Sequence, residues 1–485
     1  MKRPVVCFFG ADAPTFQNGD LMTLLSFPTD ENIDHIASLD PDVVITIGES
    51  WNKFPNLTSK INRSKWFHCT DIKNVTLDSI YHCYINNLSN NIACLPKENM
   101  PLISCFCPSY DSSGKINRPY RSLLAQTYPY WEWIIINDQP HSEENCKVLR
   151  ELEQSDARIR VYGINSNTGN IGQHKFETAS LARGKYLAEL DHDDDLTTDC
   201  LEMVKEAFDQ HPEAGFAYTD FAELFEKDLA PYNYGHNWAY GFGGYYAQMT
   251  RIPGVKEPVL THVARSANIN EHTIANIVGV PNHIRVWEKD LYFKIGGHNP
   301  LAVGDDYEMI LRTFLNTRMV RIPYLGYCQY RNQSGNTTFK RLPLITLIQG
   351  TAYKVYKDRI QARLAELDIK QQNYKYCVPV WEQNYIDSNA AFTYKKEDKE
   401  TIVIITYQGR IPFETAIKDA MKKDCEICIV GNGVSYLDDA LKKYRNDPRI
   451  RWWNLHKTFD DDGETAKKYA DYNMVRTGNP VYVYA

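Results

Sequence analysis

At 485 residues the chain is too long for one ordinary domain, and typical domain sizes predict about three. Its 43% hydrophobic and 24% charged residues indicate a globular protein, and its net charge of −7 argues against general binding to nucleic acids or anionic membranes. No apolar run approaches the roughly 20 residues that span a bilayer, and no signal-like segment follows residues 1–4. We therefore expect no transmembrane segment and a cytoplasmic location.

The twelve cysteines show neither a disulfide framework nor paired zinc spacing. Cys105 and Cys107 lie in one apparent strand, and Cys425 and Cys428 lie in another. This distribution indicates reduced, buried thiols, as is usual in a cytoplasmic protein.

Residues 1–97 are predicted to form a small N-terminal α/β domain, with apolar strands near 4–9, 41–47 and 65–68. The second strand ends at residues 48–50, Gly-Glu-Ser, which we interpret as a turn rather than a ligand loop. The polar stretch 86–100 is typical of a linker.

A doubly wound α/β pattern dominates the next predicted domain, residues 98–340. Strands are expected at four places, with helices between them: 102–107, 131–136, 158–161 and 186–190. Right-handed crossovers bring the ends of parallel strands to one edge of the sheet, so Pro108, Tyr110 and Asp138 are expected to converge there. An aromatic ring, a carboxylate and a cation at such an edge would suit a nucleotide.

Four carboxylates follow the last of these strands within five residues: Asp191, Asp193, Asp194 and Asp195. Repelling carboxylates are costly unless a partner neutralises them, and hard divalent cations prefer oxygen ligands. The cluster therefore predicts a metal site, and the alternative is a solvated loop that caps the next helix.

Four blocks resemble family 2 glycosyltransferases of the GT-A fold, in order and spacing across about 100 residues. They are residues 122–138, Asn167-x-Gly169, residues 182–186 and residues 190–194. Residues 137–140, Asn-Asp-Gln-Pro, replace the family's usual Asp-Asp-Gly-Ser, and Gln-His-Lys at 173–175 replaces its Ala-Arg-Asn. Both departures fall at the expected base contacts.

The resemblance implies an inverting, metal-dependent transfer of a sugar from a nucleotide-sugar donor, a UDP-sugar in particular, to a hydroxyl of a glycan or other acceptor. Asp193 would hold Mn²⁺ or Mg²⁺, and Asp191 would contact the ribose or the metal shell. The family's catalytic acidic pair corresponds to Asp305 and Asp306, and Asp306 would be the base. A helix N-terminus keeps a carboxylate ionised, and a plain helix cap is the alternative role.

Three basic residues are candidates for the donor diphosphate. His174 or Lys175 would neutralise its charge. Residues 330–337 resemble the family's loop that closes over the donor diphosphate, and the resemblance implies that Arg331 would clamp it. The insert at 226–282 is rich in aromatic residues, which would form an acceptor-binding lid or simply pack the insert.

The remaining sequence is divided into a helical connector, residues 341–397, and a C-terminal region, residues 398–485. The C-terminal blocks repeat the order of those at 102–160 and stop before an acid cluster. We interpret this region as an incomplete second GT-A-like half-domain, either part of a longer tandem enzyme or a non-catalytic remnant.

Two other classes of function stay open. A nucleotidyltransferase of sugar metabolism would need a Gly-rich, basic triphosphate loop, and residues 108–114 are a poor version of one. A non-catalytic glycan-binding scaffold is compatible with the incomplete second copy.

Overall fold

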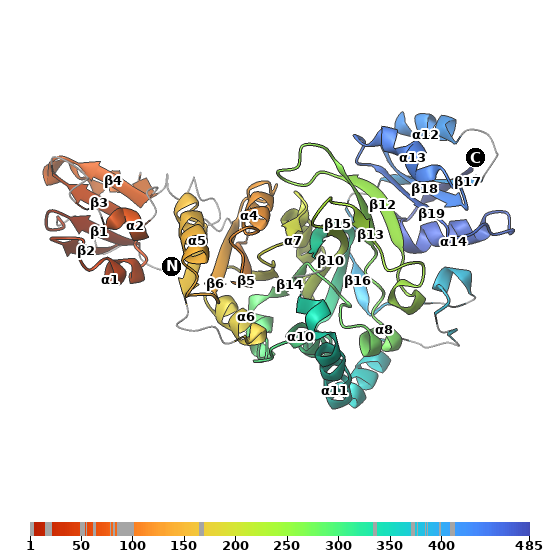
Figure 1. The fold of residues 1–485 in the computed structure, drawn as a ribbon, viewed down its shortest axis with the longest axis horizontal. Coiled ribbons are helices and arrows are strands. Elements are labelled where there is room, and N and C mark those ends of the chain that lie inside the picture. The colour runs from red at the N-terminus through yellow and green to blue at the C-terminus, as the bar shows by residue number, and fades with distance from the viewer. Residues whose placement is uncertain are drawn as a thin grey trace.

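The computed structural model shows three α/β bodies that follow one another along the chain (Figure 1). It describes residues 4–14, 22–48, 54, 56–61, 65–77, 79–80, 83–84, 101–163, 169–332, 337–369, 374–375, 377–383, 385, 387–396, 399–407 and 413–485. Glu49, Ser50, Asn167 and the linker at 86–100, all singled out in the sequence, lie outside these residues.

The N-terminal body has a four-stranded parallel sheet with the order β2-β1-β3-β4. All five residues of β3 are buried, as expected for a strand covered on both faces. Its elements are β1 (Val5–Phe9), β2 (Thr23–Phe27), α1 (Ile33–Ser38), β3 (Val43–Ile47), α2 (Leu57–Lys60), β4 (Trp66–Cys69) and the 3₁₀ helix η4 (Ile72–Asn74).

The central body begins with the predicted doubly wound unit, in which parallel strands take the order β8-β5-β6-β7. Its elements are β5 (Ile103–Ser109), α4 (Asn117–Leu124), β6 (Trp131–Asn137), α5 (Glu143–Ser155), β7 (Ile159–Gly163), α6 (Ile171–Ser180), β8 (Tyr186–Glu189), β9 (Asp195–Leu196) and α7 (Cys200–Gln210). Ile103 and Cys105 pack with α4, α5 and α7 on one face, whereas Phe106 packs toward α6 on the other. This alternation follows from the two-residue period of a strand.

Strands in antiparallel and parallel pairings complete the central sheet beside β8. β14 runs antiparallel to β8 and places Arg285 opposite Glu189. The elements of this part are β10 (Ala214–Phe225), β14 (Arg285–Glu288), α9 (Lys289–Lys294), α10 (Asp305–Asn316) and β15 (Arg318–Arg331). Helix α10 packs on the same face as α6, so its N-terminus lies over the end of β8.

The insert lengthens the sheet and joins it to the C-terminal body. Its elements are β11 (Pro231–Tyr232), the 3₁₀ helix η6 (Trp238–Gly241), β12 (Tyr245–Thr250), β13 (Val259–Ala264) and α8 (Glu271–Asn276). β12 pairs with β13 and, at Ala247–Trp452, with β19 of the C-terminal body. One sheet therefore runs through both bodies.

The C-terminal strands take the parallel order β20-β17-β18-β19, which is the order of β8-β5-β6-β7 in the central body. The elements are β17 (Glu400–Tyr407), α12 (Glu414–Met421), β18 (Cys425–Asn432), α13 (Leu437–Leu441), η8 (Lys442–Tyr444), β19 (Ile450–Asn454), α14 (Glu464–Asn473) and β20 (Pro480–Tyr484). The shared strand order supports the predicted second half-domain. That this region is a repeat of the central one stays a prediction.

The segment expected as a helical connector is more varied than its sequence indicated. Its elements are α11 (Thr337–Glu366), the 3₁₀ helix η7 (Val380–Glu382) and β16 (Ala391–Thr393). β16 pairs with β15 and so belongs to the large sheet. Within the described parts of the chain, no helix is long and apolar enough to cross a membrane.

Candidate active site

The four carboxylates after β8 divide into two pairs with different environments. Asp191 and Asp193 keep 31% and 27% of their side chains exposed, whereas Asp194 and Asp195 are buried. Asp194 accepts a hydrogen bond from Tyr327 Oη at 2.8 Å, and Asp195 accepts one from Tyr330 Oη at 2.6 Å. Only Asp191 and Asp193 are therefore placed to meet a ligand, and the other two anchor the loop to β15.

Burial is the main cause of the shifted pKa values of Asp194 and Asp195. It raises the pKa of Asp194 well above the usual range, and the charges of Asp193 and Asp191 raise it further. Burial likewise raises the pKa of Asp195 to about 6, partly offset by the hydrogen bond from Tyr330. The repulsion expected among four adjacent carboxylates is thus reduced, because two of them take up protons readily.

Beneath this loop lies a buried cluster of charges centred on Glu189, the last residue of β8. Lys175 Nζ lies 2.5 Å from Glu189 Oε1 and 3.1 Å from Asp305 Oδ2. Arg285 contacts Glu189 Oε2 at 3.2 Å and Asp306 Oδ2 at 3.1 Å. Although burial acts to raise the pKa of Glu189, Lys175 and Arg285 hold that pKa well below its usual range.

The two acids that begin α10 are not equivalent. Asp305 is almost fully buried, and burial raises its pKa to about 6 against the opposing charge of Lys175. The side chain of Asp306 is 24% exposed. Burial acts to raise the pKa of Asp306 as well, but Arg285 and Lys175 outweigh it, and the net shift is downward. Asp306 is thus the accessible, ionised carboxylate of the pair.

A group of residues suited to a cation lies beside the acid loop. One ligand atom from each of Glu189, Asp191 and His283 falls within 4.8 Å of the others. Two carboxylates and an imidazole form a donor set that accepts Mn²⁺ and related ions. Because Glu189 already binds Lys175 and Arg285, Asp191 and His283 are the more available ligands. Asp193 is not in this group, and its carboxylate lies 3.7 Å from Lys115 Nζ.

The strand ends also bring the predicted nucleotide contacts together. Pro108, near the end of β5, aligns with Ile136 of β6, and the backbone nitrogen of Asp138 donates to Ser109 at 2.9 Å. Tyr110, which follows β5, is 51% exposed. Asp138 is buried, and its Oδ1 lies 3.2 Å from His174 Nε2.

Lys175 and Arg331, two of the residues predicted to contact the diphosphate, bind other residues in the structure. Lys175 is inside the buried cluster around Glu189 rather than at the open edge. Arg331 pairs with Glu223, and its guanidinium lies 3.7 Å from the centre of the Tyr232 ring. Their diphosphate roles stay predictions.

Several residues of this site were not singled out in the sequence: Glu189, Arg285 and His283. Glu189 carried a signal, because an acid within an apolar strand must find a partner when it is buried. Arg285 and His283 carried none, since they lie about 95 residues away and only the pairing of β8 with β14 brings them near.

Part of this region matches a known protein family. Residues 104–265 match the family described as "Glycosyl transferase family 2". A putative teichuronic acid biosynthesis glycosyltransferase of Bacillus subtilis is 33% identical over 132 residues, which are 27% of this chain and 50% of the relative. Chondroitin synthase of Pasteurella multocida is 28% identical over 349 residues, 72% of this chain and 30% of the synthase. The match spans half or less of each relative.

Among solved structures, Staphylococcus aureus TarS 1–349 in complex with UDP-GlcNAc is similar with a TM-score of 0.38 and 14% identity. That match covers 55% of this chain and 73% of the TarS chain. The family match confirms the resemblance seen in the motifs and the GT-A type of α/β fold for residues 104–265.

The raised pKa of Asp195 predicts a specific dependence of stability on pH. Its folded pKa, about 6, exceeds the ordinary value of 3.8, so the folded state binds the proton more tightly. The Asp195 contribution to stability is therefore present at low pH and is lost as pH rises through 4 to 6. In urea unfolding, the wild type should lose about 2 kcal/mol more than Asp195→Asn between pH 4 and pH 7.5. Equal losses in the two proteins would contradict the assignment.

Proposed function

We propose that this chain transfers a sugar from a nucleoside diphosphate sugar to an acceptor hydroxyl with inversion. The premise is that residues 104–265 belong to glycosyltransferase family 2. The observation that carries the proposal is Asp306, an ionised and accessible carboxylate whose charge is maintained by Arg285 and Lys175. Arg285 joins it to Glu189 at the end of β8, just before Asp191.

Asp306 would act as the general base. Its carboxylate would accept the proton of the acceptor hydroxyl while that oxygen attacks the anomeric carbon of the donor. The new carbon–oxygen bond forms on the face opposite the leaving group, and the bond to the diphosphate oxygen breaks with its electron pair. One base suffices for this displacement, so the chain needs no covalent nucleophile. Arg285, which binds Asp306 at 3.1 Å, would hold the base in position.

The residues at the edge fit a divalent cation. Asp191 and His283 would hold it, with Asp193 as the ligand that the family resemblance implies. When bound there, Mn²⁺ or Mg²⁺ would neutralise charge on the departing diphosphate.

A UDP-sugar is the donor that we propose. The exposed ring of Tyr110 offers a face for base stacking, and the Asp138 carboxylate can accept a hydrogen bond from the imide N–H of uracil. His174 lies against Asp138 and would fix the direction of that carboxylate. For the acceptor we propose a glycan chain, because the similar proteins include a chondroitin synthase and a teichuronic acid biosynthesis enzyme.

The first test of the base is Asp306→Asn, with transfer and donor affinity measured on the same protein. The amide keeps the size of the side chain but cannot take the proton, so transfer should slow by about 10² or more. Affinity for the nucleotide sugar, measured by calorimetry, should change little. Glu308→Gln in the same helical turn is the matched control, because Glu308 pairs with Arg312 instead. Transfer within a few-fold of wild type would refute the role of Asp306.

The second test concerns the cation. Treatment with EDTA should abolish transfer, and added Mn²⁺ or Mg²⁺ should restore it. Asp193→Ala should abolish turnover of the donor, and His283→Ala should raise the Mn²⁺ concentration for half-maximal activity by about tenfold or more. Full activity in the presence of EDTA would exclude a metal role for this group of residues.

A further inference from the structure

A cavity lies between the insert and the C-terminal body, and none of the residues proposed for the donor, the metal or the base line it. Its volume is about 280 Å³. The walls come from the insert, from the connector at Trp381, from the end of β19 and from α14. The segments that build it are thus far apart in sequence, and most of them lie outside the family match at 104–265.

Aromatic rings form the walls, and their contacts with one another hold them in place. Tyr245 and Trp453 stack with ring centres 5.3 Å apart, and Trp381 meets Tyr469 edge-on at 4.9 Å. The backbone nitrogen of Tyr245 donates to Tyr469 Oη at 3.0 Å. The cavity is therefore preformed, which reduces the entropy that a ligand must lose on binding.

Polar side chains line the rim. His236 and His456 come from the insert and the C-terminal half-domain, and their rings stack with centres 4.3 Å apart. Both are exposed, and His236 makes no hydrogen bond to any residue that the structure describes. Asn454 Oδ1 accepts from the Val434 nitrogen at 2.8 Å, which fixes the direction of that side chain.

The chemistry of the lining selects the class of ligand. The described residues that line the cavity include no lysine, arginine, aspartate or glutamate. Without a lysine or arginine to pair with a phosphate, the lining disfavours a nucleotide. Aromatic faces with a few imidazole and amide groups suit an uncharged ring that bears hydroxyls, since such a ring has apolar faces and a polar perimeter.

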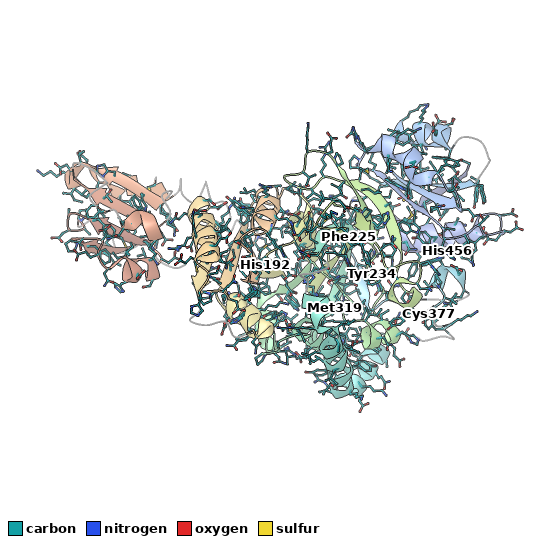
Figure 2. All side chains as sticks on the ribbon, viewed as in Figure 1. His192, Phe225, Tyr234, Met319, Cys377 and His456 are labelled. Carbon is teal, nitrogen blue, oxygen red and sulfur yellow. The ribbon has the colours of Figure 1, made fainter. Side chains whose placement is uncertain are left out.

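Hydrogen bonds connect this cavity to Arg331, the residue predicted to clamp the donor diphosphate. The nitrogen of Tyr234 donates to the hydroxyl of Tyr245, which lines the cavity, at 2.8 Å. The Tyr234 hydroxyl in turn hydrogen-bonds Glu223, the partner of Arg331. In the view of Figure 2, Tyr234 lies between His192 of the acid loop and His456.

We propose that the cavity binds one uncharged sugar unit of the acceptor glycan, away from the hydroxyl that is glycosylated. The identity of the ligand as an acceptor rests on the proposed transferase function. A long acceptor would occupy both this cavity and the region beside Asp306, whereas a short one would reach only the latter.

The test compares acceptors of two lengths in the full chain. Chondroitin and hyaluronan hexasaccharides alternate an uncharged amino sugar with a uronic acid, and their disaccharides serve as short probes. His236→Ala should raise the KM for the bound hexasaccharide by about tenfold, the cost of one good ring contact, and kcat should change less. The KM for the disaccharide should stay within twofold. Asn237→Ala, an exposed neighbour outside the cavity, is the control.

Binding is also measured without donor, which separates this inference from the transferase proposal. Trp381 and Trp453 line the cavity, so a hexasaccharide should change the tryptophan fluorescence of wild type, and Trp453→Leu should weaken that change. Binding of the hexasaccharide without transfer would contradict the transferase proposal but would still support sugar binding in the cavity. Absence of hexasaccharide binding, equal KM changes for both lengths, or displacement of the hexasaccharide by UDP would each overturn the inference.

Discussion

The site depends on the burial of one carboxylate, Glu189, at the end of β8. A buried carboxylate without partners would cost several kcal/mol or more, so the fold must bring cations to it. Lys175 arrives from α6 and Arg285 from β14, and both also contact the acids that begin α10. Four elements are thereby fixed relative to one another. The same two cations that satisfy Glu189 keep Asp306 ionised, so the structural and the chemical requirement share one set of contacts.

Much of this arrangement could be predicted from the sequence. Apolar strands that end in polar residues, with helices between them, place Pro108, Tyr110, Asp138 and Asp191 at one edge by the handedness of crossovers alone. The sequence could not show which of the four acids turn inward, because that depends on Tyr327 and Tyr330 of a strand more than 130 residues away. The family resemblance identified Asp306 rather than Asp305 as the base. The sequence could not show how the two acids differ in burial and pKa, because that difference arises from partners on α6 and β14.

The insert has a larger role than its composition indicated. It joins the central sheet to the C-terminal body through β12 and β19. A partly buried set of hydrogen bonds reinforces the junction. Asp387 of the connector accepts from Asn268 at 2.8 Å and from Tyr472 of α14, and Arg265 donates to the Tyr472 carbonyl at 2.7 Å. The cavity proposed for the acceptor lies at this junction, so the C-terminal body can contribute to the site without an acid cluster of its own.

If Arg285 keeps Asp306 ionised so that it can act as the base, the pH dependence of kcat/KM should change when Arg285 is replaced. In Arg285→Gln the pKa of Asp306 should rise, since burial would then act with one opposing cation fewer. The acidic limb of the profile should move to higher pH by about one unit or more, whereas Arg285→Lys, which keeps a positive charge, should shift it less. Circular dichroism would verify that both variants are folded. An acidic limb at the same pH in wild type and folded Arg285→Gln would contradict the account.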